Sequence, residues 1–223
     1  MAKLKSRILI YGTGQIGNMV ASILELDSNV KIVGFVDDDE SKWGSEFRGY
    51  QILGGFKVLE RSSSYDAVTV ALGRVEPRRE VAQRMQTLGI RQYSAIHPSA
   101  LVSEGCTLGK GCIIGAGVNL FVNPTIGSNV FIGPSVVVSH DSVVGDFCLL
   151  SVGSIIGARV NVEPGAFIGA GATVMPPGWG RDARLRIGAD AIVGVGAVVI
   201  RNVEQRAIVA GVPAKLLRYR EDL

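Results

Sequence analysis

Two neighbouring residues in the second half of the chain could support acid–base chemistry. His140 is one of only two histidines in 223 residues, and Asp141 follows it directly. A histidine titrates near neutral pH, so it can accept a proton from an attacking amine or hydroxyl, and a neighbouring carboxylate can orient its ring. The pair therefore indicates a general-base site, and a surface histidine without a function is the alternative.

A glycine-rich loop near the amino terminus could bind an anion. Gly12, Gly14 and Gly17 form a Gly-x-Gly-x-x-Gly motif between an apolar run and a helical pattern. Backbone N–H groups and the helix dipole at such a turn favour a group such as a pyrophosphate. Asp37 lies 20 residues after Gly17, where a ribose-binding acid is often found. The motif predicts nucleotide-type binding, and a tight turn without a ligand is the alternative.

The elements around the glycine loop are those of a small α/β domain. Apolar runs predict strands at residues 7–11, 31–36 and 65–72, and helical patterns follow the loop and cover residues 76–88. Strands that alternate with helices indicate a parallel sheet. We therefore expect a Rossmann-like domain at residues 1–94.

From residue 96 onward the sequence has a period of six. Fourteen consecutive positions in steps of six, from Ile96 to Val174, are aliphatic, and the series resumes at Ile187. A glycine often follows the aliphatic residue, and a small residue often stands four positions after it. This is the hexapeptide repeat of a left-handed parallel β-helix, in which the aliphatic side chain points to the axis and the glycine opens the corner. We place this domain at residues 95–223.

Composition and charge narrow the class of protein. The chain is 47% hydrophobic and 19% charged with a net charge of +3, which fits a globular protein and gives no reason to expect a nucleic-acid partner. No apolar stretch is long enough to span a membrane, and the amino terminus does not have the pattern of a signal peptide. Cys106, Cys112 and Cys148 fall on the small inward position of the repeat, without metal spacing. We therefore expect core cysteines, no metal site and a cytoplasmic location.

Several segments together resemble the sugar O-/N-acyltransferase family of the NeuD and PglD type, the hexapeptide-repeat acetyltransferases. The resemblance runs almost end to end, through Gly12–Gly17, Gly34–Asp39, Ala71–Gly73, His97–Ala100, Ser139–Asp141, Ile168–Ala172, Gly194–Val199 and Gly211–Lys215. It implies a homotrimer that uses acetyl-CoA to N-acetylate a nucleotide-linked amino sugar in bacterial lipopolysaccharide or capsule biosynthesis. An O-acetyltransferase acting on sialic acid or another sugar is the alternative.

The resemblance also implies roles for individual residues. His140 takes the general-base position and Asp141 that of the adjacent acid, and transfer to the sugar is direct, without an acyl-enzyme. Acetyl-CoA is expected in the groove between neighbouring β-helices, where Ala158 offers its N–H to the thioester carbonyl. The other expected cofactor contacts are Ala170, Val195, Pro213 and Lys215. The nucleotide part of the substrate is expected to meet Gly12, Gly14, Gln15, Asp37, Asp38 and Gly73.

Three features depart from the pattern of this family. Ile16 and Leu149 stand where some members have a histidine, which leaves the identity of the sugar open. The hexad series also breaks after Val174, where seven extra residues lie within 175–186. We hypothesise that this loop reaches toward the active groove and that Arg181, Arg184 or Arg186 contacts a phosphate of CoA or of the nucleotide. A solvated loop is the alternative.

Other functions remain as alternatives at this point. The glycine loop would suit an NAD-linked dehydrogenase, but a hexad β-helix supplies no hydride site. A γ-class carbonic anhydrase shares the β-helix but needs three histidine ligands, and this chain has only His97 and His140. A non-catalytic scaffold is a third alternative. For a sugar acid, Arg74 and Arg78 are candidates to bind the carboxylate, although a charge on the helix surface is the simpler explanation of Arg78.

Overall fold

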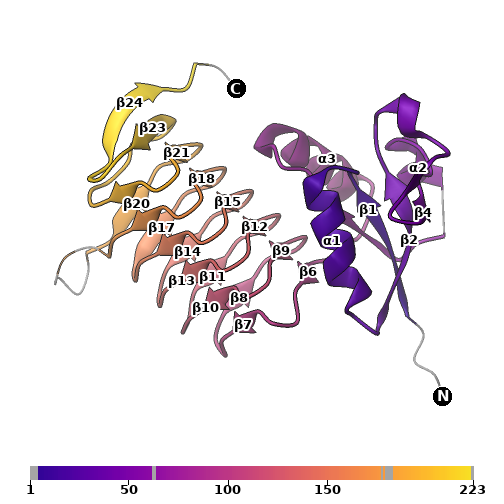
Figure 1. Cartoon of the computed structure of the whole chain (residues 1–223), viewed down its shortest axis with the longest axis horizontal. Coiled ribbons are helices and arrows are strands. Elements are labelled where there is room, and N and C mark those ends of the chain that lie inside the picture. Colours follow the sequence, from indigo (N-terminus) through magenta and orange to yellow (C-terminus); the bar gives the residue numbers. More distant parts are fainter. Residues whose placement is uncertain (1–4, 62–63, 177, 179–182, 222–223) are drawn as a thin grey trace. The chain divides into compact units, whose positions relative to one another are not determined.

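The computed structural model describes residues 5–61, 64–176, 178 and 183–221. The chain divides into two compact units, Met1–Pro98 and Ser99–Leu223, which are coloured indigo to magenta and magenta to yellow in Figure 1. Among the described helices, none combines the length and the apolar composition that a membrane span requires.

The first unit is built on a three-stranded parallel sheet. Its strands are β1 (Ser6–Tyr11), β2 (Val30–Val36) and β5 (Ala67–Val70), in the order β2-β1-β5. The central strand β1 is buried in the core of the unit, and its apolar residues Ile8, Leu9 and Ile10 are fully buried. Helix α1 (Gln15–Glu25) follows β1, and helix α3 (Val75–Thr87) follows β5. The expected α/β domain is therefore confirmed.

Shorter elements complete the first unit. They are the 3-10 helix η1 (Glu40–Lys42), the hairpin strands β3 (Glu46–Phe47) and β4 (Tyr50–Gln51), helix α2 (Lys57–Arg61) and strand β6 (Ala95–Ile96). The sequence patterns did not predict the hairpin or α2, since each is too short to show a hydrophobic period.

The second unit is a left-handed parallel β-helix with three faces, as predicted, and Figure 1 shows its stacked coils. The first face contains β7 (Leu101–Val102), β10 (Asn119–Leu120), β13 (Val137–Val138), β16 (Ile155–Ile156), β19 (Thr173–Val174) and β22 (Val198–Val199). The second face contains β8 (Thr107–Leu108), β11 (Thr125–Ile126), β14 (Val143–Val144), β17 (Val160–Val162) and β20 (Leu185–Ile187). The third face contains β9 (Ile113–Ile114), β12 (Phe131–Ile132), β15 (Leu149–Leu150), β18 (Phe167–Ile168), β21 (Ile192–Val193) and β23 (Ala207–Ala210). Strand β24 (Lys215–Tyr219) pairs antiparallel with β23.

The aliphatic and small positions of the repeat fill the axis of the β-helix. Val138 pairs with Ile156 in the next coil, and both side chains are fully buried. Cys112 and Cys148, on the small position, are also fully buried, and Cys106 is partly buried. The cysteines therefore belong to the core packing, as expected from their place in the repeat.

The corners of the coils are made differently from what the repeat suggested. The left-handed backbone conformation stands three residues after the aliphatic position, for example at Gly117 and Asp141, with φ of 65° and 56°. The glycine directly after the aliphatic residue has no such φ. A Cβ on Gly157 would instead lie 2.6 Å from the backbone nitrogen of Pro176 in the next coil. That glycine therefore permits close stacking of the coils and does not form the corner.

We name each edge of the β-helix by the faces that it joins. Within the described residues, the 1–2 edge comprises residues 103–106, 121–124, 139–142, 157–159, 175–176, 183–184 and 200–202, and the 3–1 edge comprises residues 115–118, 133–136, 151–154, 169–172, 194–197 and 211–214. The repeat is interrupted between the first and second faces, because β19 ends at Val174 and Leu185 of β20 pairs with Val160 of β17. The interruption therefore falls on the edge that carries His140.

Candidate functional site

His140 and Asp141 form a pair on the 1–2 edge. The Nδ1 atom of His140 lies 2.9 Å from Oδ2 of Asp141, and the two side chains are 53% and 48% exposed. Because Nδ1 faces the carboxylate, this contact favours the tautomer with the proton on Nδ1, which leaves Nε2 as the acceptor nitrogen of the ring. The pair can therefore accept a proton from a group bound at this edge.

Asp141 is held in place by its position in the corner. It has the left-handed φ of the corner residue, and its N–H donates to the carbonyl of Val122 in the preceding coil at 3.2 Å. The hydrogen bond with His140 lowers the pKa of the Asp141 carboxyl, and a hydrogen bond from Asn123 and the charge of Arg184 lower it further, against a smaller opposite effect of burial. Asp141 is therefore ionised at neutral pH and can stabilise a protonated His140.

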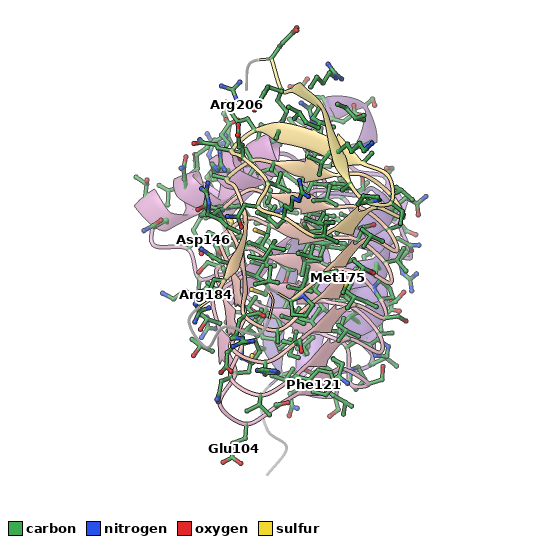
Figure 2. The ribbon with its side chains drawn as sticks, turned by 90° about the vertical axis from the view of Figure 1, so that its left-hand side faces the viewer. Glu104, Phe121, Asp146, Met175, Arg184 and Arg206 are labelled. Carbon is green, nitrogen blue, oxygen red and sulfur yellow. The ribbon has the colours of Figure 1, made fainter. Side chains whose placement is uncertain are left out.

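A cavity of about 380 Å³ opens beside His140. Its lining is completed by Phe121, Val122, Asn123, Ser139 and Asp141. Phe121 and Val122 are 44% and 55% exposed, so the cavity presents an apolar wall next to the polar pair. Phe121 is visible in Figure 2 on the lower coils.

Sequence reasoning missed Phe121 and Val122, although the repeat contained a signal for them. Glycine follows the aliphatic residue at Gly109, Gly127 and Gly145 on another edge, but the 1–2 edge has Phe121 and Ser139 at that position. On the 1–2 edge a side chain stands at this position in most coils, and Gly157 is the exception.

Ala158 occupies the next coil beside His140. The N–H of the following residue, Arg159, donates to the carbonyl of His140 at 3.0 Å, which fixes the stacking of the two coils. Within the part of the chain that the structure describes, no acceptor is found for the N–H of Ala158. An amide donor at this place can meet an oxygen of a bound acyl group.

The insertion returns to the site through Arg184. Its Nη1 donates to the main-chain carbonyl of Asp141 at 3.0 Å, and Figure 2 shows Arg184 at the side of the β-helix. The nearby Arg186 instead pairs with Glu163 at 3.2 Å. Arg181 lies outside the described residues. The end of the loop therefore reaches the His140 corner, and the expected phosphate contact stays a prediction.

The other expected cofactor residues lie on a different edge. Ala170, Val195 and Pro213 belong to the 3–1 edge, where the N–H of Gly196 donates to the carbonyl of Ala170 at 2.9 Å. Val195 is 77% exposed. Within one chain, these residues and His140 therefore lie on opposite edges of the first face.

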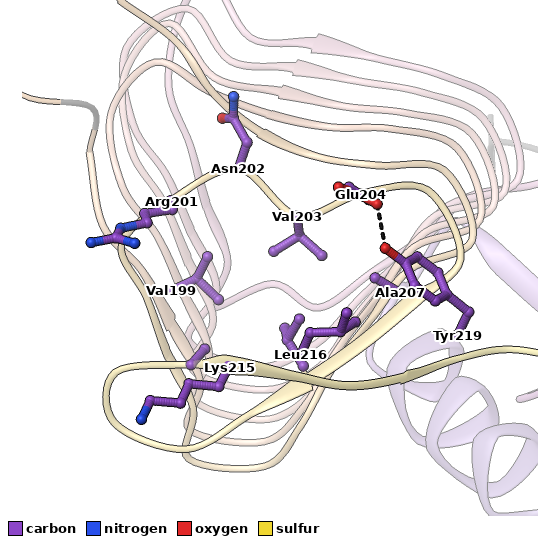
Figure 3. A pocket seen from close by; sticks show the side chains of 11 residues that line it. Val199, Arg201, Asn202, Val203, Glu204, Ala207, Lys215, Leu216 and Tyr219 are labelled. Atoms are coloured by element: carbon purple, nitrogen blue, oxygen red, sulfur yellow. Dashed lines mark hydrogen bonds between the residues drawn. The ribbon is translucent and has the colours of Figure 1, made fainter.

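Lys215 begins β24 at the carboxyl-terminal end of the β-helix. It lines a second cavity of about 320 Å³, together with Arg201, Val203, Leu216 and Tyr219 among others. Figure 3 shows the residues that line this cavity between the strand of Lys215 and the segment of Asn202 and Glu204, and the hydroxyl of Tyr219 donates to Glu204. The cavity combines an apolar floor with two cationic side chains, Arg201 and Lys215.

In the first unit, the glycine loop is a tight strand–helix turn. Gly12 has a φ of 109°, and its N–H donates to the carbonyl of Val36 at 2.7 Å. A Cβ on Gly17 would lie 2.1 Å from the oxygen of Gly12, so only glycine fits there. Gly14 caps α1 and Gln15 begins it, and both are exposed.

The carboxylate of Asp37 is occupied within this loop. It accepts the N–H of Thr13 at 3.0 Å and the hydroxyl of the same residue, the N–H of Asp39 at 3.0 Å, and Lys42. Burial raises the pKa of the Asp37 carboxyl, but these hydrogen bonds outweigh it and lower the pKa overall. Asp37 therefore stabilises the loop, and its expected contact with a ribose stays a prediction.

Asp38 faces a third cavity, of about 190 Å³, that also contains Tyr11, Gly12 and Arg84 in its wall. The carboxylate accepts the hydroxyl of Tyr11 and the N–H of Phe56, the latter at 3.0 Å. Burial, and then the hydrogen bond to Asp38, raise the pKa of the Tyr11 hydroxyl. Since a carboxylate offers about four acceptor directions, Asp38 keeps capacity for a ligand.

The arginines that follow Gly73 differ from expectation. Gly73 itself is exposed, and a Cβ there would lie 3.3 Å from Ile16. The interpretation of Arg78 as a surface charge is wrong, because its side chain is only 1% exposed and donates to the carbonyls of Leu72 and Gly73 at 2.9 and 3.3 Å. Arg78 thus holds the segment after β5, and Arg74 at the start of α3 is exposed.

Two further observations bear on the alternatives. Leu149 lies on the third face in β15 and is only 9% exposed, so this position is not on the edge that carries His140. Within the described residues, no group of three His, Cys, Asp or Glu side chains is arranged to hold a metal ion.

The fold and the candidate site have counterparts among known proteins. Residues 4–96 match the family model described as C2185-like, N-terminal. The structure of WeeI from Acinetobacter baumannii AYE has a TM-score of 0.87 and 25% identity, with 96% of this chain and 100% of that chain covered. The acetyltransferase domain of PglB from Neisseria gonorrhoeae FA1090 has a TM-score of 0.85 and 25% identity, with the same coverage. PerB from Caulobacter crescentus, solved in complex with CoA and GDP-perosamine, has a TM-score of 0.75 and 28% identity over 96% of this chain and 98% of that chain.

An α/β unit joined to a hexapeptide β-helix, together with these neighbours, defines an acyltransferase of the hexapeptide-repeat class. Within that class, the chain is similar to sugar N-acyltransferases such as the GDP-perosamine N-acetyltransferase of Caulobacter crescentus.

Proposed function

We propose that the chain transfers an acetyl group from acetyl-CoA to the amine of a nucleotide-linked amino sugar, with His140 as the general base. The observation that carries this proposal is the pairing of His140 with Asp141 at 2.9 Å, beside a cavity that both residues line. One proton acceptor suffices for an amine that attacks a thioester, so His140 can be the only general base of the reaction. Acetyl-CoA is the co-substrate, in keeping with the CoA bound to PerB.

The residues on the 1–2 edge supply each requirement of a direct transfer. His140 accepts a proton at Nε2 as the amine nitrogen forms its bond to the thioester carbon, and Asp141 stabilises the resulting imidazolium. The N–H of Ala158 donates to the carbonyl oxygen as negative charge develops there. When the carbon–sulfur bond breaks, His140 returns the proton to the departing thiolate. The products are the amide and free CoA, and the enzyme is unchanged.

The nucleotide part of the substrate is assigned to the first unit. Gly12, Gly14, Gln15 and Gly73 lie at or near the turn before α1, where the N–H groups at the start of the helix suit a phosphate. PerB was solved with a nucleotide sugar bound. Asp38 is better placed than Asp37 to meet the ligand, because Asp37 is occupied by Thr13, Asp39 and Lys42. A reaction of this kind would serve bacterial surface glycan biosynthesis in the cytoplasm.

A homotrimer would complete the site. Large apolar side chains that are exposed concentrate on the first face and its two edges, at Leu101, Ile155, Phe121, Val122, Met175, Ile200, Val152, Val195 and Val212. Such a surface favours burial against further copies of the chain. Three-fold symmetry would bring the 1–2 edge of one copy to the 3–1 edge of the next, so that Ala170, Val195, Pro213 and Lys215 could meet acetyl-CoA bound beside His140.

O-acetylation of sialic acid is the runner-up. It would need a cationic pocket for the sugar carboxylate, and the burial of Arg78 removes one of the two arginines proposed for that role. Arg74 remains exposed, but a single exposed arginine is weak support.

A substrate panel tests the proposal. Thiol release from acetyl-CoA is measured with UDP-, GDP- and dTDP-linked amino sugars and with free sialic acid. Turnover of at least one nucleotide amino sugar is expected, with an amide as the product by mass spectrometry. Turnover of sialic acid alone would identify the protein as an O-acetyltransferase. Binding of acetyl-CoA without turnover of any of these acceptors would contradict the proposed substrate class.

A further inference from the structure

The seven-residue insertion sends one arginine back to the proposed base. We infer that Arg184 is a positioning residue that holds Asp141 so that its carboxylate orients His140. This inference rests on the proposed role of His140, and the contact that motivates it is the 3.0 Å hydrogen bond from Nη1 of Arg184 to the carbonyl of Asp141.

The register of the coils explains how Arg184 reaches this carbonyl. Leu185 pairs with Val160, so Arg184 stands over Arg159 in the same corner column, and Arg159 stands over Asp141. Two coils correspond to about 10 Å along the axis, since neighbouring strands are about 4.8 Å apart. The long side chain of Arg184 bridges this distance, which the side chain of alanine could not do.

Asp141 is bound by residues outside its own coil. It adopts the left-handed conformation of the corner residues, with a φ of 56°. Its N–H is bound from the preceding coil by the carbonyl of Val122 at 3.2 Å, and Arg184 binds its carbonyl from the other side. The two contacts clamp the peptide units on both sides of the Asp141 side chain. The carboxylate is thereby held 2.9 Å from Nδ1 of His140.

The charge of Arg184 has a second consequence. The hydrogen bond with His140 is the main cause of the lowered pKa of the Asp141 carboxyl, and the charge of Arg184 makes a smaller contribution in the same direction. A guanidinium that already donates to a main-chain carbonyl is also a less available partner for a phosphate. Positioning and phosphate binding make different kinetic predictions, because the first acts on the chemical step and the second on the binding of acetyl-CoA or nucleotide.

The test compares Arg184→Ala, Arg184→Lys and Arg48→Ala. We expect Arg184→Ala to lower kcat about five- to tenfold, with the KM for acetyl-CoA changed less than about twofold. Arg184→Lys should recover part of kcat, because an ammonium group can donate to the same carbonyl. Arg48→Ala is the matched control, since its guanidinium also makes side-chain contacts, with Asn18 and Glu25, and none of these residues belongs to the proposed site; it should keep the wild-type kcat. Melting temperatures verify that all variants fold, and the lysine variant keeps the comparison possible if the alanine variant is unstable.

A double-mutant cycle shows whether Arg184 acts through Asp141. In an Asp141→Ala background, Arg184→Ala should have almost no further effect on kcat, because the carboxylate to be positioned is gone. Equal losses in both backgrounds would overturn the inference, as would an unchanged kcat in Arg184→Ala. A raised KM for acetyl-CoA at unchanged kcat would also overturn it and favour the phosphate contact. His140→Ala is assayed in parallel. If this variant keeps its activity, the proposed function itself is wrong; if it loses activity, the result for Arg184 tests the inference alone.

Discussion

Replacing Gly157 by alanine tests how the stacking of the coils positions the site. A Cβ there would lie 2.6 Å from the nitrogen of Pro176 and 2.7 Å from the oxygen of Val174. These are backbone atoms of the next coil, so the coils must separate by roughly 0.8 Å to restore van der Waals distances. Overpacking of this kind costs about 1–3 kcal/mol, which corresponds to a decrease in Tm of about 2–12 °C for a chain of this size.

Gly145→Ala is the matched control for this variant. Its Cβ would lie 2.7 Å from the nitrogen of Pro164, so it introduces the same kind of clash on another edge. Both variants should lose similar stability. Gly157 directly precedes Ala158, however, and a displacement of that amide should reduce kcat about tenfold, since small misplacements of catalytic groups are costly. Gly145→Ala should keep a kcat close to that of the wild type.

The assay combines thermal unfolding with steady-state kinetics well below both melting temperatures. An unchanged Tm in both variants would refute the argument that these glycines allow the coils to stack. A similar decrease in Tm with equal kcat values in the two variants would refute the placement of Ala158 at the reacting centre.

Three further predictions concern pH, a buried charge and assembly. Asp66 is paired with Arg7, which lowers the pKa of its carboxyl to about 2, so its contribution is present above about pH 4 and is lost as the pH falls toward 2; Asp66→Asn should flatten the dependence of Tm on pH in that range. Arg78→Met leaves the carbonyl of Leu72 without its donor, and should lower stability by about 1–3 kcal/mol in denaturant unfolding. Ile155→Asp places a charge on the first face and should convert a trimer to monomers in analytical ultracentrifugation, with loss of activity; an active monomer would contradict the shared site.

The β-helix could be predicted from the sequence because each coil repeats the same local requirement. Leu120, Val138 and Ile156 must all point to one axis, and a period of six leaves few other structures. The place of His140 on an edge followed from the same count. The role of glycine after the aliphatic residue did not follow, because it depends on the distance between coils that are 18 residues apart, as at Gly157 and Pro176.

Other features depended on contacts that no local pattern specifies. Arg78 lies in a helix with many charged residues, and only the path of the segment after β5 shows that its guanidinium is buried against Leu72. The hydrogen bonds that occupy Asp37 come from Thr13 and Lys42, which are distant from each other in sequence. The contact of Arg184 with Asp141 spans 43 positions and arises from an insertion outside the repeat.

The most direct test of the central claim is the kcat of His140→Ala with the nucleotide amino sugar that the wild type acetylates best. His97→Ala serves as the control, since it removes the other histidine of the chain. The account predicts a loss of about a hundredfold or more in His140→Ala, with the fold intact and acetyl-CoA still bound, and near-normal kcat in His97→Ala. A His140→Ala variant that keeps most of its kcat would contradict the assignment of His140 as the general base.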